Sequence, residues 1–166
     1  DMETYSKALN AGQYPLSVLA VTAHAAELYR KGIYGNTMTA NPRALDVGCE
    51  VLGSLGSELR ENIRARGREF VAKLEKLKGE LPGYLTKVQG TGLLFSCELA
   101  PQFKGYGAGS TEEWLRERGI GVIHGGANSL RFTPHFAMDS EQLDLLVALV
   151  GPALCAGPRA EQAAAA

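Results

Sequence analysis

The chain has 166 residues, of which 45% are hydrophobic and 21% are charged, and its formal net charge is −1. Such a composition is ordinary for a soluble globular protein, and the length allows a real core. The near-zero charge gives no electrostatic case for binding nucleic acid or an anionic membrane, and no apolar run approaches the roughly 18 residues of a membrane helix. Three cysteines without close spacing argue against a disulfide framework or a zinc site and favour a reducing compartment, which we expect to be the cytoplasm.

The first 45 residues contain two short strand-like runs, at 1–7 and 17–21, and a plausible short helix at 23–30. Two short strands cannot make a stable sheet alone. The chain also opens on Asp1 rather than on methionine. We therefore expect it to be the C-terminal part of a longer protein, or a chain that lacks its first half.

A long helix is predicted next. Asn41 suits the N-cap position, and Pro42 suits the first helical position, where its missing N–H costs nothing. An apolar stripe with helical spacing then continues for about ten turns. It consists of Leu52, Leu55, Leu59, Ile63, Phe70, Leu74, Leu77 and Leu81. The helix can be interrupted near Gly53, Gly56 or Gly67, and Pro82-Gly83 ends it.

Strands and short helices alternate in the remaining sequence. Strands are expected at 85–88, 93–99, 120–123 and 130–133, with a tight turn at 124–126. Ser110 to Glu113 forms a capping-box pattern that opens a short helix, and a final amphipathic helix is expected at 139–150. This order predicts a small α/β domain over residues 70–154, followed by a disordered Ala-rich tail at 155–166.

Two motifs near the start of the chain carry a resemblance to a known family. Ser6-Lys7-Ala8-Leu9 precedes the turn Gly12-Gln13-Tyr14-Pro15, and a Gly-Asn-Thr loop occupies residues 35–42. Together they resemble the class III, ornithine/acetylornithine-type aminotransferases, which are pyridoxal phosphate enzymes of fold type I. The resemblance implies an α/β fold in which residues 1–45 end the large cofactor-binding domain. It also implies that residues 46–69 form a linking helix and residues 70–154 the small C-terminal domain.

Lys7 is the residue that the resemblance singles out for catalysis. A lysine amine can form a Schiff base with an aldehyde cofactor, here pyridoxal 5'-phosphate, when it is partly desolvated. The small residues Ala8, Ala11 and Gly12 would let a ring approach the backbone. Considered by itself, a lysine is most often a solvated surface charge. The resemblance implies instead that Lys7 holds the cofactor and then shuttles a proton.

The resemblance implies that two further residues bind the cofactor or the substrate. Thr37 matches a threonine that reaches the cofactor phosphate of the neighbouring subunit, which implies a homodimer with shared active sites; the simpler reading is a capped turn before a helix. Arg131 matches an arginine that handles a carboxylate, either of the substrate or of a partner glutamate. The simpler reading is a strand-edge arginine in a structural ion pair.

The function expected from these residues is transfer of an amino group between an amino donor and a keto or aldehyde acceptor. An aminomutase or decarboxylase of the same fold stays open, as does a non-catalytic binding or assembly module. Because the family places other cofactor ligands earlier in the chain, this segment alone is not expected to catalyse the reaction. Gly90 to Phe95 lacks the third glycine of a dinucleotide fingerprint, and the three histidines lack metal-ligand spacing, so no metal site is expected.

Overall fold

The computed structural model describes residues 1–33, 35 and 40–160. These residues form two compact units, which meet in the sequence between Gly56 and Ser57. We call them unit 1 and unit 2 and describe each by itself.

Unit 1 is built around a two-stranded sheet. Strand β1 (Met2–Ser6) pairs antiparallel with strand β2 (Ser17–Val21), so that Met2 lies opposite Val21. A single 3-10 turn, η1 (Lys7–Asn10), follows β1 directly. Every residue of both strands is exposed, and no third strand joins them among the described residues. The two expected strands therefore exist, but they pair only with each other.

Two helices complete unit 1. Helix α1 (Ala23–Ala26) is shorter than the helix expected at 23–30, and helix α2 (Pro42–Ser54) packs on η1. The predicted start of α2 is confirmed, because the Asn41 side chain accepts the Arg43 N–H at 3.1 Å and Pro42 is the first helical residue. Gly48 lets α2 approach the turn closely, since a Cβ there would lie 3.3 Å from Leu16 Cδ2.

The long apolar stripe is divided between two helices. The chain leaves helical geometry at Leu55, where ψ is 59°, and helix α3 (Ser57–Glu80) begins after Gly56. Of the three glycines at which a break was open, Gly67 stays inside α3. The segment expected to be one linking helix, residues 46–69, is thus the end of α2 and the start of α3, on either side of the unit boundary.

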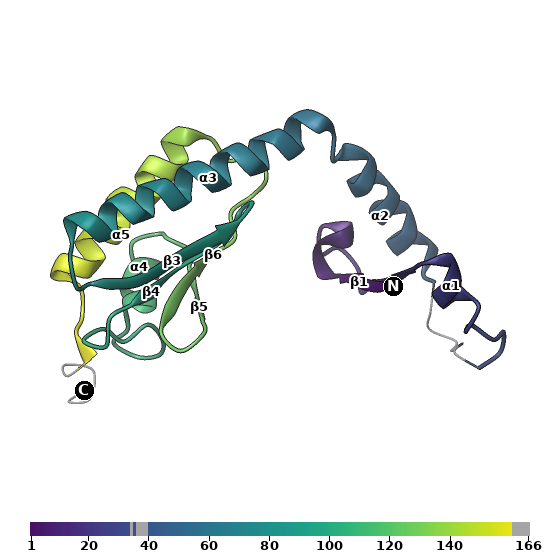
Figure 1. Ribbon diagram of the computed structural model, residues 1–166, viewed down its shortest axis with the longest axis horizontal. Helices are drawn as coiled ribbons and strands as arrows, with labels where there is room; N and C mark the ends of the chain where they lie inside the picture. Colours follow the sequence, from purple (N-terminus) through teal and green to yellow (C-terminus); the bar gives the residue numbers. More distant parts are fainter. Residues whose placement is uncertain (34, 36–39, 161–166) are drawn as a thin grey trace. The chain divides into compact units, whose positions relative to one another are not determined.

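Unit 2 is an antiparallel sheet with helices packed on it. Its four strands are β3 (Leu85–Thr91), β4 (Leu94–Leu99), β5 (Ile123–Gly125) and β6 (Ser129–Phe132). They lie in the order β3-β4-β6-β5, so β6 is an inner strand. Helices α3 and α5 (Ser140–Ala156) lie side by side along the sheet, and the short helix α4 (Thr111–Arg116) contacts α5 (Figure 1).

The core of unit 2 lies between α3, α5 and one face of the sheet. Phe70 of α3 stacks on Phe95 of β4 with ring centroids 3.9 Å apart, and Phe132 of β6 lies beside both rings. Alternate residues of β4 are buried, as expected for a strand with one face on the core. Cys97 is one of them, and burial raises the pKa of its thiol to about 12.

One backbone contact fixes α3 on the sheet. Gly92, in the left-handed conformation, turns the hairpin between β3 and β4. A Cβ on Gly67 of α3 would lie 2.1 Å from the Gly92 carbonyl oxygen, so only glycine fits at position 67. The Gly90 to Phe95 segment is therefore a hairpin, which agrees with rejecting it as a dinucleotide motif.

Two local predictions in unit 2 need correction. Ile120 and Val122 are buried as a strand would bury them, but the expected strand at 120–123 is displaced to Ile123–Gly125. The reason is that the Ile120 N–H donates to the Leu115 carbonyl and the Val122 N–H to the Ile120 carbonyl. The tight turn expected at 124–126 correspondingly occupies residues 126–128.

The predicted capping box at Ser110 is half formed. The Ser110 hydroxyl accepts the Glu113 N–H at 3.2 Å, but the Glu113 carboxylate accepts the N–H of Gly109 rather than that of Ser110. A complete capping box instead opens α5, where Asp139 and Gln142 exchange side-chain and backbone hydrogen bonds.

Residues 155–160 differ from the expected disordered tail. Helix α5 continues to Ala156, and the Arg159 guanidinium lies 4.4 Å from the centroid of the Phe103 ring. The Ala160 N–H donates to the Gln102 carbonyl at 2.9 Å. Ring contacts and backbone hydrogen bonds hold this segment on unit 2, and residues 161–166 lie outside the described residues.

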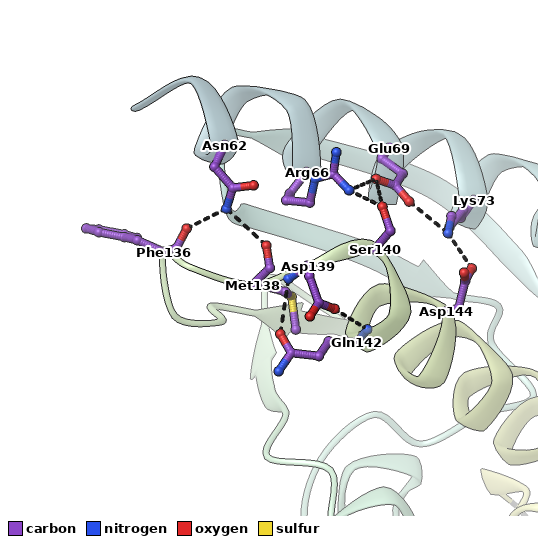
Figure 2. A network of polar contacts seen from close by, with 10 residues as sticks. All are labelled: Asn62, Arg66, Glu69, Lys73, Phe136, Met138, Asp139, Ser140, Gln142 and Asp144. Carbon is purple, nitrogen blue, oxygen red and sulfur yellow. Dashed lines mark hydrogen bonds and ion pairs between the residues drawn. The ribbon is translucent and has the colours of Figure 1, made fainter. Parts of the chain in front are cut away.

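A polar network joins α3 to the start of α5 (Figure 2). Glu69 accepts hydrogen bonds from Ser140 at 2.9 Å and pairs with Arg66 at 2.6 Å and with Lys73 at 2.9 Å. Lys73 also contacts Asp144 of α5. Burial acts to raise the pKa of Glu69, but hydrogen bonds from Lys73 and Ser140 and the nearby positive charges outweigh it and lower the pKa.

Candidate functional site

Lys7 begins the turn between the two strands of unit 1, and its backbone is in the left-handed conformation with φ of 55°. This conformation is uncommon for a residue with a side chain and costs about 1–3 kcal/mol. Ala11 has the same φ of 55°, and Gly12 follows with φ of 71°. The Gly12 N–H donates to the Lys7 carbonyl at 3.3 Å and the Ala11 N–H to the Ala8 carbonyl at 3.0 Å. A tight, strained turn therefore presents the lysine.

The side chain of Lys7 is exposed and has no ion-pair or hydrogen-bond partner among the residues described. The residues near it in the turn include Ala8, Ala11 and Gly12, which have small side chains or none. The described residues leave this amine solvated, so they do not supply the partial desolvation expected of a lysine that forms a Schiff base.

Asn10, at the end of η1, is a residue that the sequence reasoning missed. Its side chain is completely buried, and its Nδ2 donates to the Tyr14 carbonyl at 3.0 Å. Asparagine commonly makes such side-chain-to-backbone bonds in turns, and this tendency is the signal that could have identified it. The bond connects the lysine turn to the start of the next strand.

Thr37 lies outside the described residues, so its expected phosphate contact stays a prediction. The described part of its surroundings is the start of α2. There, Asn41 and Pro42 open a helix of 13 residues, whose N-terminal N–H groups favour negative charge.

Arg131 lies on β6, opposite Ser96 of β4 and Ile123 of β5. Its side chain is exposed on the sheet face away from the buried Leu130 and Phe132. Because β6 is an inner strand, the alternative of a strand-edge arginine is wrong. No carboxylate of the described residues lies within ion-pair distance of Arg131, which leaves its guanidinium donors available.

The surface around Arg131 is a shallow hollow of about 470 Å³. Most of the lining residues are polar or glycine, including Gln89 of β3, Ser96 and Glu98 of β4, and Ser129 of β6 itself. The Glu98 carboxylate accepts the Thr86 hydroxyl at 2.7 Å. A forked guanidinium in this hollow is suited to binding a carboxylate with two parallel hydrogen bonds.

The remaining titratable cluster of unit 2 lies beside α4. His124 Nδ1 is 3.4 Å from Glu112 Oε2, and its ring lies 3.9 Å from the Tyr106 ring. Across the part of the chain that the structure describes, no three histidine, cysteine or acidic side chains are grouped so as to hold a metal ion. Lys7 and Arg131 belong to different units, so each part of the candidate site is described alone.

Comparison with known proteins identifies the fold and the family. The family model described as aminotransferase class-III matches residues 1–154. Ornithine aminotransferase from Plasmodium yoelii has a TM-score of 0.82 and 25% identity, covering 93% of this chain and 40% of that one. Acetylornithine aminotransferase from Elizabethkingia anophelis has a TM-score of 0.77 and 27% identity, covering 94% and 41%. These neighbours place the chain in the α/β fold of the fold type I pyridoxal phosphate enzymes.

Curated relatives agree with this assignment. The mitochondrial acetylornithine aminotransferase of Neurospora crassa is 30% identical over 149 residues, which cover 87% of this chain and 30% of that protein. The acetylornithine aminotransferase of Xylella fastidiosa is 32% identical over 144 residues, covering 86% and 34%. The chain thus spans about a third of the length of the relatives it matches, and the cofactor of their family is pyridoxal phosphate. On the family match and these relatives, the chain belongs to the class III aminotransferases.

Proposed function

We propose that this chain is the C-terminal part of a longer pyridoxal phosphate-dependent aminotransferase, which moves an amino group from an amino donor to a keto or aldehyde acceptor. The observation that carries the proposal is the strained turn that presents the amine of Lys7, which has no ion-pair or hydrogen-bond partner among the described residues. The family match over residues 1–154 supports it, and the coverage of only about a third of the relatives supports a missing N-terminal portion.

Lys7 has two roles in this proposal. When bound, pyridoxal phosphate supplies an electron sink that stabilises negative charge next to the reacting amino group. Lys7 Nζ would hold the cofactor covalently through its aldehyde, and after release it would move a proton at the reacting carbon. A backbone fixed by the turn would keep Nζ at one position for both tasks.

Arg131 would bind and orient a carboxylate of the substrate. Its inner-strand position fixes the backbone, and its guanidinium has no competing ion pair among the described residues. Holding a carboxylate in a defined place restricts the motion of the bound substrate, which accelerates a reaction.

Thr37 would contact the cofactor phosphate of a neighbouring subunit, which makes the complete enzyme a homodimer with shared active sites. The N-terminus of α2, which begins after this loop, supports an anion site. We also propose a cytoplasmic location, which three unpaired cysteines favour. Among the described residues, no helix has the length and apolar character needed to cross a membrane.

The decisive experiment is Lys7→Ala in the complete enzyme. We expect turnover to fall by at least the 10²–10⁴-fold that a general acid–base group supplies, with the fold unchanged. Borohydride reduction of the wild-type protein should fix the cofactor to the peptide that contains Lys7. Lys31→Ala removes another exposed lysine of unit 1 and should leave turnover near normal. An adduct on a different lysine, or normal turnover of Lys7→Ala, would contradict the proposal.

A further inference from the structure

The conformation of Lys7 needs support from outside the residue. A left-handed backbone persists only when its surroundings fix it, and the exposed Lys7 side chain forms no hydrogen bond or ion pair with the described residues. The two backbone hydrogen bonds of the turn close it locally, from Gly12 to Lys7 and from Ala11 to Ala8. Both bonds lie within the turn, so they do not attach it to the strands or to α2.

Asn10 is the polar side chain that anchors the turn. Its Nδ2 donates to the Tyr14 carbonyl at 3.0 Å, and its own carbonyl accepts the Gln13 N–H at 3.2 Å. These two bonds tie the end of η1 to the segment that leads into β2. The residue is completely buried, whereas Lys7, Ala8 and Ala11 around it are exposed.

Helix α2 covers Asn10 from the other side. A Cβ on Gly48 would lie 4.0 Å from Asn10 Cβ and 3.9 Å from the Leu9 carbonyl oxygen, so the helix backbone runs directly over the turn. Asn10 Oδ1 has no hydrogen-bond partner among the described residues. A buried acceptor without a partner is unfavourable, so burying an asparagine here is a poor solution if stability alone is considered.

We propose that Asn10 is a positioning residue for Lys7. Through its bond to the Tyr14 carbonyl, Asn10 keeps the turn closed and Lys7 in the left-handed conformation, which fixes where the amine is presented. The proposal rests on the proposed role of Lys7. Without Asn10, Lys7 relaxes to the right-handed or extended conformations that residues with side chains prefer, and its amine moves away from the reacting position.

The test compares Asn10→Ala and Asn10→Asp in the complete holoenzyme. Aspartate has nearly the same shape as asparagine but cannot donate to the Tyr14 carbonyl. We expect both variants to lose about tenfold in turnover, since a left-handed residue is disfavoured by roughly that factor once released. The KM for the amino donor should not change. Borohydride trapping of pyridoxal phosphate on Lys7 should slow by a similar factor.

Thr22→Ala provides the matched control. The Thr22 hydroxyl accepts the Ala25 N–H and caps α1 in the same unit, so its loss removes a hydrogen bond without touching the lysine turn. This variant should keep normal turnover and trapping. Normal trapping and turnover in Asn10→Asp, or a lowered melting temperature with normal kinetics in both Asn10 variants, would overturn the proposal. Failure of the wild-type protein to trap cofactor on Lys7 would instead refute the proposed function.

Discussion

Unit 1 and unit 2 differ in where they place their apolar side chains. Unit 2 buries four phenylalanine rings in the core that its two long helices form with one sheet. In unit 1, the buried residues are few and small, and large apolar side chains are exposed on both strands and on α2. They include Met2, Val18, Leu19, Val21, Leu45 and Leu52. The difference indicates that unit 2 has a core of its own, whereas the described residues of unit 1 leave most of their large apolar side chains exposed.

An apolar hollow of about 270 Å³ adds to this contrast. It lies within unit 1 between the sheet and α2, and it is lined by Tyr5, Leu9, Leu16, Val18, Ala20, Leu45, Gly48, Cys49 and Leu52. An apolar surface of this kind is unfavourable in water unless something covers it. The proposed cofactor lysine therefore lies in the unit that is less able to hold its own structure.

The largest difference between the units is expected in their unfolding when each is expressed alone. Residues 57–160 expressed alone should unfold in one cooperative transition, because their core is complete. Residues 1–56 alone should show no such transition, since a two-stranded sheet is marginal in water. Circular dichroism during heating measures both. A cooperative transition of residues 1–56 would remove the distinction between the units.

Thiol labelling should reveal the same contrast within the intact chain. Cys49 on α2 is exposed, whereas Cys97 on β4 is buried, with a pKa raised to about 12. Since the thiolate is the reactive form, Cys49 should react at once and Cys97 only on unfolding, slower by roughly 10³-fold or more at neutral pH. Mass spectrometry of the labelled peptides gives both rates. Comparable rates would show that the core of unit 2 is open.

Truncating one large apolar side chain in each unit should lower the free energy of unfolding by unequal amounts. Phe70→Ala should destabilise unit 2 by about 3–5 kcal/mol, because it leaves a cavity under two other rings. Leu52→Ala on α2 should change the stability of this chain by no more than about 0.5 kcal/mol, since the leucine is 53% exposed. Urea unfolding measures both. In the longer enzyme that we propose, a larger cost for Leu52→Ala would show that further polypeptide covers this side chain.

The smallest effect concerns the network between α3 and α5. Because the pKa of Glu69 is lowered in the folded state, its contribution is present above the ordinary value of 4.5 and is lost as the pH falls through the folded value. Glu69→Gln should therefore cost about 1 kcal/mol near pH 7 and progressively less as the pH falls below 4.5. Glu75→Gln, outside this network, is the control. A cost that does not change as the pH falls until the protein unfolds would contradict an electrostatic role.

Helices could be predicted from the sequence where a capping residue or the spacing of apolar residues marks them. Asn41 and Pro42 predicted the start of α2, and the leucine spacing predicted the helical stripe. The sequence could not choose among Gly53, Gly56 and Gly67 as the break, because the choice depends on packing: Gly67 contacts the hairpin and stays helical. Ile120 and Val122 alternate like a strand, yet their N–H groups are taken by a turn, which apolar alternation does not show.

The candidate site was predictable to a different extent for each residue. Lys7 was proposed from its motif, but its left-handed backbone could not be seen in the sequence. Asn10 could have been identified from the tendency of asparagine to bond to the backbone in turns, whereas its burial under α2 depends on tertiary packing. Arg131 was found as a residue, but its inner-strand position depends on the strand order β3-β4-β6-β5. Strand order is set by tertiary packing, and hydrophobic periodicity carries no record of it.

The contact between Gly67 and Gly92 has a consequence for how the sequence of this family member can vary. Where side chains meet in the core, one aliphatic group can replace another with some repacking, so several sequences are acceptable. Where two main chains are in direct contact, a change of side-chain rotamer cannot make room for an added carbon atom. A single methyl group at position 67 would therefore push α3 away from the hairpin. Suppose that unit 2 is randomised and folded variants are selected. Several apolar residue types should then be found at positions 74 and 77, where Leu74 and Leu77 now lie, but only glycine at position 67.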